Sequence, residues 1–410
     1  MISFDPTDDQ KLMVESVAQF ARTTLRPKIR ELEKAREVPE AIRRTAHELG
    51  LGLVALPEAI GGAGLGLTTA VMLEEEIAFG DPAAGFAFAG PGAFGFALQE
   101  LATAEQAKKA LEPFAADASL FGAVAWGERK PHPDRAGLST TATKNGGEWK
   151  LDGKKAYVVN ADRAKHFVVF AQVDASAGWR GLGAFLVDKD AKGLSVAPRE
   201  TTLGLDAASF GGIALDGVIV PDGARLHGAA NDFNAALVRF FARQALVVAA
   251  RSVGLSRAAF EVTREYVDGR KAFGKPIGHF QAVAFTVADR AMDVDASRGL
   301  VWRAAAAWDA FDKGEGDERE CLLTTAQAVA YAHEAAMRCG DDGVQLHGGA
   351  GFMRDYPVEK FMRDAKQLGL CAMTAEHADQ LAGAMALGVP VASVDPGLVL
   401  PTPETQNAFV

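Results

Sequence analysis

The feature that most constrains the fold is a change in hydrophobic periodicity, which happens twice along the 410-residue chain. Residues 1–118 carry apolar side chains at helical spacing, whereas residues 119–229 show short alternating runs separated by glycine and aspartate. Residues 230–388 return to long helical periods, and a proline-containing tail follows over 389–410. We therefore expect a helical part, a β-rich part and a second helical part, with domain boundaries near residues 119 and 229.

Composition excludes several classes of function. The 53 acidic and 43 basic residues give a net charge of −10, which argues against nucleic acid as a partner because phosphate binding needs excess cations. The three cysteines have no metal-ligand spacing and an odd count, so we expect neither a metal site nor a disulfide framework. We see no signal peptide and no apolar stretch of the length that a membrane span needs, and we expect a cytoplasmic protein.

The segment Gly269–Gln281 has the features of a nucleotide-binding link between two helices. It carries Arg270, Phe273, Gly274 and Gln281 at fixed offsets. A guanidinium group pairs well with pyrophosphate, an aromatic ring packs on adenine, and glycine lets a backbone come close to a ligand. These residues suit the ADP half of a dinucleotide.

A second glycine-rich segment, Gln345–Gly351, follows about seventy residues later and contributes Gln345, Gly348 and Gly349. The two segments, in this order, resemble the acyl-CoA dehydrogenase family. The resemblance extends from about residue 5 to residue 388 and includes four further stretches: Leu56–Gly66, Glu74–Ala78, Leu151–Lys155 and Asp216–Pro221.

The resemblance implies a particular fold and chemistry. The fold would comprise an N-terminal helical domain, a central β-barrel or sandwich domain and a C-terminal four-helix bundle, assembled as a tetramer. The activity would be the α,β-desaturation of an acyl-CoA thioester by an oxidoreductase that acts on CH–CH bonds. FAD would be the cofactor, and an electron-transfer flavoprotein or a similar protein would accept the electrons.

The two positions at which the family carries its catalytic glutamate hold no carboxylate here. One position corresponds to Ala372, which has no atom that accepts a proton, and the other to Gln244, whose amide is no base near neutral pH. Glu376 is a weak candidate for a relocated base, because on a continuous helix it would lie one turn after Ala372. The charged residues between Asp355 and Lys366 are expected to form solvated faces or interhelical ion pairs.

Positions that face the flavin ring are also altered. Gly127 stands where the family has a threonine, Pro133 replaces a serine, and Tyr157 and Val159 occupy a run that normally supplies another hydroxyl group. Backbone amides can still bind the ring, so these changes weaken the flavin half of the site without abolishing it.

The retained and lost residues together indicate a subunit that depends on a partner. In the family, the ADP-half residues of one subunit reach the FAD of its neighbour. A chain that keeps this donated half and lacks a base resembles the non-catalytic subunit of a heteromeric α2β2 dehydrogenase for steroid side chains or other bulky acyl-CoA substrates in lipid catabolism. Its partner would be a paralogous, glutamate-bearing chain.

Two alternatives remain open. One is a self-sufficient homo-oligomeric flavoprotein with a relocated base such as Glu376. The other is a lyase that uses Gln244, as in relatives that eliminate a leaving group from the acyl chain. Those relatives place an arginine by the substrate, and the corresponding stretch Gly85–Gly92 contains no cation.

Overall fold

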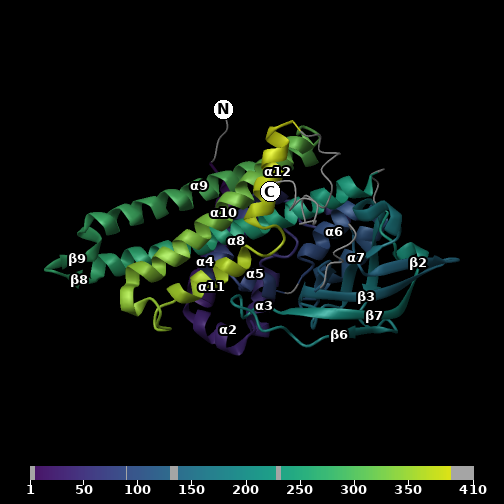
Figure 1. The fold of residues 1–410 in the computed structure, drawn as a ribbon, viewed down its shortest axis with the longest axis horizontal. Coiled ribbons are helices and arrows are strands. Elements are labelled where there is room, and N and C mark those ends of the chain that lie inside the picture. Colours follow the sequence, from purple (N-terminus) through teal and green to yellow (C-terminus); the bar gives the residue numbers. More distant parts are fainter. Residues whose placement is uncertain (1–4, 89, 130–136, 228–231, 389–410) are drawn as a thin grey trace.

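The computed structural model describes residues 5–88, 90–129, 137–227 and 232–388. Pro133 and the tail over 389–410 lie outside these residues. Within them, two sets of helices enclose one end of a curled sheet, and a long helical bundle extends away from the sheet (Figure 1). This arrangement confirms the predicted fold class.

The N-terminal part is helical because its apolar residues recur on one face of each helix and because polar residues mark the helix starts. Thr7 and Thr103 each form a capping box with the glutamine three residues later. The helices are α1 (Asp8–Phe20), α2 (Ile29–Ala35), α3 (Glu40–Glu48), α4 (Gly66–Gly80), α5 (Ala84–Ala87), α6 (Ala93–Leu101) and α7 (Ala104–Ala116). Helix α4 is buried on nearly all sides and packs against α1, α8 and α9.

The central part forms one seven-stranded sheet with the strand order β1-β4-β2-β3-β7-β6, and β5 pairs with β4. Its strands are β1 (Gly122–Ala125), β2 (Thr141–Asn145), β3 (Glu148–Val159), β4 (His166–Gln172), β5 (Leu182–Asp188), β6 (Leu194–Val196) and β7 (Phe210–Pro221). The antiparallel pairing of β3 with β7 shifts register between Lys155 and Val158, and Tyr157 there adopts a φ of 57°. The bulge lies at the edge of the cavity described below.

The C-terminal part comprises α8 (Phe233–Gly269), α9 (Gln281–Asp312), α10 (Glu318–His347), α11 (Val358–Leu368) and α12 (Ala375–Ala386). Asp232, Asp317 and Thr374 cap the starts of α8, α10 and α12. Between α8 and α9, the short hairpin of β8 (Lys271–Ala272) and β9 (Lys275–Pro276) projects from the end of the bundle that is far from the sheet (Figure 1).

We expected no apolar stretch long enough for a membrane span, and α8 contradicts this expectation. By length and composition it passes that test, alone among the helices that the structure describes. However, 72% of its apolar window is buried inside the chain, because α8 packs against α4, α6, α9, α10 and α11. Its apolar character is therefore that of a core helix.

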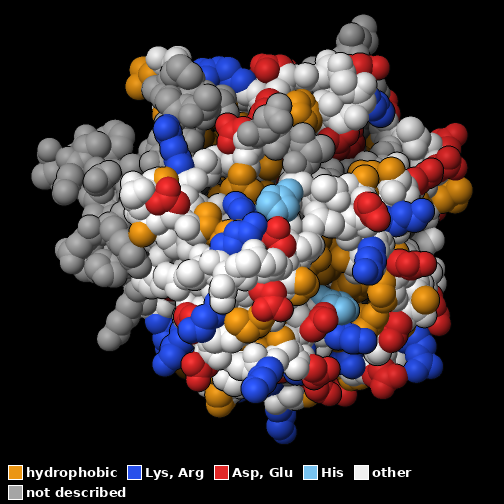
Figure 2. Space-filling view, turned by 90° about the vertical axis from the view of Figure 1, so that its right-hand side faces the viewer, with side chains coloured by type: hydrophobic (Ala, Val, Ile, Leu, Met, Phe, Trp, Pro, Cys, Tyr) orange, Lys and Arg blue, Asp and Glu red, His pale blue; other side chains and the backbone are white. Residues whose placement is uncertain are grey.

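Charge is mixed on the surface of the sheet end. Figure 2 shows this face with lysine and arginine side chains interspersed among aspartate and glutamate. The described side chains on this face consequently offer no continuous basic surface.

Candidate functional site

A cavity of about 740 Å³ lies where the three parts of the chain meet, and we call it the central cavity. Helices α4 and α6 with the segments around them form one side, β1, β3 and the segment after β1 form another, and α8 forms a third. The lining is mostly apolar, with a few polar side chains, as is typical of ligand sites.

Both expected base positions line the central cavity. Gln244 belongs to α8, and Ala372 lies in the turn between α11 and α12 with a φ of 61°. The structure thus brings together two residues that are 128 positions apart (372 − 244). A left-handed conformation at a residue other than glycine is uncommon and is often found at functional sites.

The prediction that Glu376 lies one helical turn after Ala372 is wrong. Helix α11 ends at Leu368 and α12 begins at Ala375, so Ala372 and Glu376 do not share a helical face. The Glu376 side chain is exposed and is absent from the described lining of the central cavity. A backbone hydrogen bond at the start of α12 and the Thr374 hydroxyl lower its pKa, which suits a helix-terminal carboxylate rather than a base.

The expected flavin-facing residues Gly127, Tyr157 and Val159 also line the central cavity. Gly127 is required by the local packing, because a Cβ there would lie 2.9 Å from the carbonyl oxygen of Ala156. The Tyr157 side chain is 57% exposed at the cavity edge, with the Arg129 guanidinium 5.7 Å from its ring centroid. The altered residues therefore change the donor set at the cavity edge, and they leave the cavity itself open.

A buried ion pair holds this edge in place. The Glu128 carboxylate accepts hydrogen bonds from the Lys155 ammonium at 2.9 Å, from the backbone N–H groups of Ser139 and Thr140, and from the Thr140 hydroxyl. Lys155 also donates to the carbonyl oxygen of Trp126 at 3.1 Å. Burial lowers the pKa of Lys155 to about 8, and Glu128 opposes that shift.

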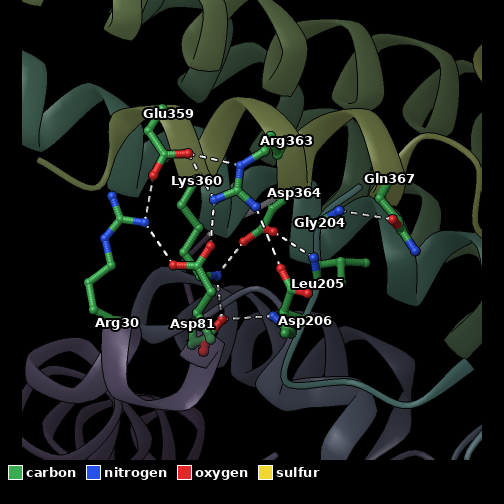
Figure 3. A network of polar contacts seen from close by, with 12 residues as sticks. Arg30, Asp81, Gly204, Leu205, Asp206, Glu359, Lys360, Arg363, Asp364 and Gln367 are labelled. Carbon is green, nitrogen blue, oxygen red and sulfur yellow. Dashed lines mark hydrogen bonds and ion pairs between the residues drawn. The ribbon is translucent and has the colours of Figure 1, made fainter. Parts of the chain in front are cut away.

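The opposite wall depends on α11. The Gln367 side chain accepts from the N–H of Gly204 at 3.1 Å, and Asp364 accepts from the N–H of Leu205 at 2.6 Å (Figure 3). Arg363 donates to the carbonyl of Leu203 at 3.2 Å. Leu203 and Gln367 line the central cavity.

On the same helix, Lys360 lies between Asp81 at 3.2 Å and Asp364 at 2.5 Å, and all three side chains are at most 1% exposed. The expectation of solvated faces is therefore wrong for Asp364. The alternative expectation, an interhelical ion pair, holds for Arg363 and Glu359, which pair with Glu33 and Arg30 on α2.

The residues expected to hold an ADP group lie at the far end of the bundle. Arg270, Phe273, Gly274 and Gln281 are all exposed. Phe273 is 97% exposed at the tip of the β8–β9 hairpin and has a φ of 51°. The Arg270 guanidinium has no ion pair among the residues that the structure describes.

The second glycine-rich segment lies at the same end. The Tyr266 hydroxyl donates to the carbonyl oxygen of His347 at 3.2 Å, and their rings stack with centroids 4.1 Å apart. Because Tyr266 lies one turn before Arg270, this contact ties Gln345, Gly348 and Gly349 to the end of α8. All three are exposed.

The donor set at this end fits the ADP half of FAD. A Cβ at Gly274, Gly348 or Gly349 would meet no described atom of this chain within 4 Å, so the open space beside these glycines is available to a ligand. The Arg270 guanidinium, which no described residue pairs, and the exposed ring of Phe273 belong to the same end of the bundle.

One chain cannot use both halves for the same dinucleotide. Gln244 and Arg270 are 26 residues apart on α8 (270 − 244), which corresponds to about 39 Å at 1.5 Å per residue. FAD does not span that distance from its flavin ring to its adenine. One dinucleotide therefore cannot reach both the central cavity and the hairpin end of the same chain.

Sequence reasoning missed an ion pair in the cavity wall. Arg251 on α8 and Glu74 on α4 both line the central cavity and bond to each other. The available signal was a single arginine inside the apolar run Val247–Leu255, since a charged residue in a buried helix needs a partner.

Comparisons with known proteins match most of the described chain. Sequence models of the acyl-CoA dehydrogenase N-terminal, middle and C-terminal domains match residues 7–118, 123–218 and 233–372. An acyl-CoA dehydrogenase of Bacillus subtilis is 31% identical over 360 residues, covering 88% of this chain and 93% of that protein. Benzylmalonyl-CoA dehydrogenase of Aromatoleum aromaticum is 31% identical over 366 residues, covering 89% and 94%. The structure of butyryl-CoA dehydrogenase from Megasphaera elsdenii is 27% identical with a TM-score of 0.85, covering 94% and 100%.

Proposed function

The chain belongs to the acyl-CoA dehydrogenase family and uses FAD, and we propose that it is the subunit of a heteromeric enzyme that lacks its own base. The family reaction makes it an oxidoreductase of CH–CH bonds in acyl-CoA thioesters. In our proposal a glutamate-bearing paralogue supplies the base, and an electron-transfer flavoprotein or a similar carrier accepts the electrons. The assembly would be a cytoplasmic α2β2 tetramer in lipid or steroid catabolism.

The observation that carries this proposal is the lack of an available base in the central cavity. Removing the proton next to the thioester carbonyl needs a group that can accept it. Among the described lining residues Glu74 is the one carboxylate, and Arg251 binds both of its oxygens, at 2.8 and 3.1 Å. Gln244 and Ala372 cannot take the proton in its place.

The geometry of the two half-sites supports cofactor sharing. The flavin ring accepts the hydride removed from the acyl chain. Arg270, Phe273 and the exposed glycines at the hairpin end would hold the ADP half of that FAD in a neighbouring chain. The separation of about 39 Å along α8 between this end and the central cavity supports a role for that neighbour.

Exposed apolar side chains near the hairpin end support an association between chains. Phe285 and Met292 on α9 are 60% and 61% exposed, and Phe352 after α10 is 72% exposed. Large exposed apolar residues at one end of a bundle favour burial against a partner.

The test is the FAD content of the purified chain, expressed alone and then together with its paralogue. We expect the chain alone to retain little FAD and to show no dehydrogenase activity, and the co-purified complex to be yellow and active. An isolated homo-oligomer that turns over acyl-CoA with an electron acceptor would refute the proposal.

A variant of the complex tests the assigned cofactor residues. Arg270→Ala in this chain should lower the FAD retained by the complex, because the pyrophosphate loses its guanidinium partner. Lys271→Ala, on the same exposed hairpin, is the matched control and should retain FAD as the wild type does. Equal FAD retention in both variants would count against the role of Arg270.

One contact in the structure supports the lyase alternative, which the sequence of this region had disfavoured. The stretch Gly85–Gly92 has no cation of its own, but Arg251 reaches it from α8, and its Nη2 donates to the carbonyl of Gly85 at 3.2 Å. A dehydrogenase reduces an electron acceptor in step with acyl-CoA consumption, whereas an elimination does not. Acceptor reduction by the complex therefore separates the two functions.

A further inference from the structure

The central cavity contains one ion pair in an otherwise largely apolar wall. Arg251 Nε donates to Glu74 Oε2 at 2.8 Å, and Arg251 Nη2 donates to Glu74 Oε1 at 3.1 Å. The guanidinium carbon lies 4.1 Å from the centroid of the Phe86 ring. The side chains of Arg251 and Glu74 are only 7% and 22% exposed. Both charges are therefore largely removed from water, which is costly unless their hydrogen-bonding capacity is used.

That capacity is used only in part. Arg251 Nη1 has no hydrogen-bond partner among the residues that the structure describes, and each Glu74 oxygen accepts one bond from Arg251 although it can accept two. Gly85 makes room for this arrangement, because a Cβ there would lie 2.8 Å from Arg251 Nε and 2.9 Å from Glu74 Oε2. The pair thus presents both an unused donor and an unused acceptor at the cavity.

The pair is displaced from Gln244 along α8. Arg251 follows Gln244 by seven residues on α8, which is two turns on nearly the same face and about 10.5 Å along the axis. An acyl group that places its reacting carbons beside Gln244 and extends along α8 towards Arg251 would therefore bring its distal part to Arg251 and Glu74.

We propose that Glu74 and Arg251 form a subsite for an uncharged oxygen, a hydroxyl or ketone group, on the distal part of the acyl group. A hydroxyl group can donate to Glu74 and accept from Arg251, and a ketone can accept from Arg251. A carboxylate on the acyl group would be repelled by the Glu74 carboxylate, and an ammonium group would be repelled by the Arg251 guanidinium. A plain alkyl chain would cover the free N–H groups without replacing their hydrogen bonds to water. The inference rests on the proposed function only in that the cavity receives an acyl-CoA.

The test is a binding measurement that needs no turnover. The co-purified complex, without an electron acceptor, is titrated in a calorimeter with three medium-chain acyl-CoA thioesters of equal length, ending in a methyl, an ω-hydroxy and an ω-carboxyl group. The same titrations use complexes that carry Glu74→Met with Arg251→Met, and Arg251→Lys alone. The double substitution avoids the unpaired buried charge that a single removal would leave, and circular dichroism verifies its fold.

We expect the wild type to bind the ω-hydroxy compound at least about tenfold more tightly than its methyl parent, which corresponds to about 1.4 kcal/mol. The double variant should lose or reverse this preference, and Arg251→Lys should keep only part of it because lysine lacks the planar fork. Equal preference in the wild type and the double variant would overturn the proposal. So would tightest binding of the ω-carboxyl compound, or no binding of any thioester at this chain's cavity.

The test of the subsite can fail independently of the test of the proposed function. Turnover by the isolated chain would refute the proposed lack of a base and would leave the subsite standing. A wild-type complex that shares its cofactor as proposed but does not prefer the ω-hydroxy compound would refute the subsite alone.

Discussion

Replacing Lys360 with methionine should strongly destabilise the fold, because it removes the cation from a buried cluster. Lys360 lies 3.2 Å from Asp81 and 2.5 Å from Asp364, and both aspartate side chains are 0% exposed. Breaking a buried pair by removing one partner typically costs about 3–5 kcal/mol, since the remaining charge stays buried without compensation. Unfolding entropy of about 2.1 cal/mol/K per residue gives about 0.9 kcal/mol/K for this chain, so we expect Tm to fall by about 5 °C.

The loss of stability caused by Lys360→Met should depend on pH. Burial raises the pKa of Asp364 above its ordinary value of 3.8, whereas Lys360 opposes this shift, so the substitution should raise that pKa further. A carboxyl group with a raised pKa in the folded chain binds its proton more tightly there than in the unfolded chain. Its destabilising effect is therefore absent below pH 3.8 and grows as the pH rises towards the folded pKa. The difference in Tm between variant and wild type should be larger near pH 8 than near pH 5.

The assay is thermal unfolding followed by circular dichroism at both pH values. Lys366→Met, on the exposed face of the same helix, is the matched control and should change Tm by less than about 1 °C. A Lys360→Met variant that melts within about 1 °C of the wild type near pH 8 would refute the reasoning. A deficit that grows on acidification would contradict the assigned role of Asp364.

Three further predictions follow from individual residues. Glu376→Gln should leave turnover by the complex unchanged, because this exposed carboxylate is absent from the described lining of the central cavity; a large loss of kcat would reinstate it as a base. Gly204→Ala should destabilise the fold by about 1–3 kcal/mol, measured as a lower Tm, because the new Cβ would lie 2.7 Å from an Asp364 oxygen and from the Arg363 backbone. Phe273→Ala should leave Tm unchanged, since the ring is 97% exposed, but should lower the FAD retained by the complex; unchanged retention would argue against contact with adenine.

Local patterns predicted the fold well because periodicity is a local property. The short apolar run in His166–Gln172 and the helical spacing in the long C-terminal segment each depend on neighbouring residues, and the expected strand and helix appear as β4 and α8. The family resemblance also placed Gln244, counted back from Phe273, and Ala372, counted on from Lys366, and the structure brings both to one cavity.

Other features depend on contacts that no local pattern reveals. The turn at Ala372 exists because α11 stops at Leu368 and Thr374 caps a new helix, and helix boundaries are the least certain part of a sequence-based prediction. The Glu74–Arg251 pair joins residues that are 177 positions apart, and Lys360 meets Asp81 across 279 positions. A charged residue in an apolar helix signals that a partner exists, but only tertiary packing shows which one.

The exposed β8–β9 hairpin also has a consequence for how the cofactor is retained. When two chains hold one FAD between them, cofactor binding and chain association are linked equilibria. Added FAD should then tighten the association of the chains, and dilution of the complex should release FAD even when no residue has changed. The apparent FAD affinity of such an enzyme would be a property of its protein concentration, and the relative abundance of the two chains in the cell would set how much active enzyme forms.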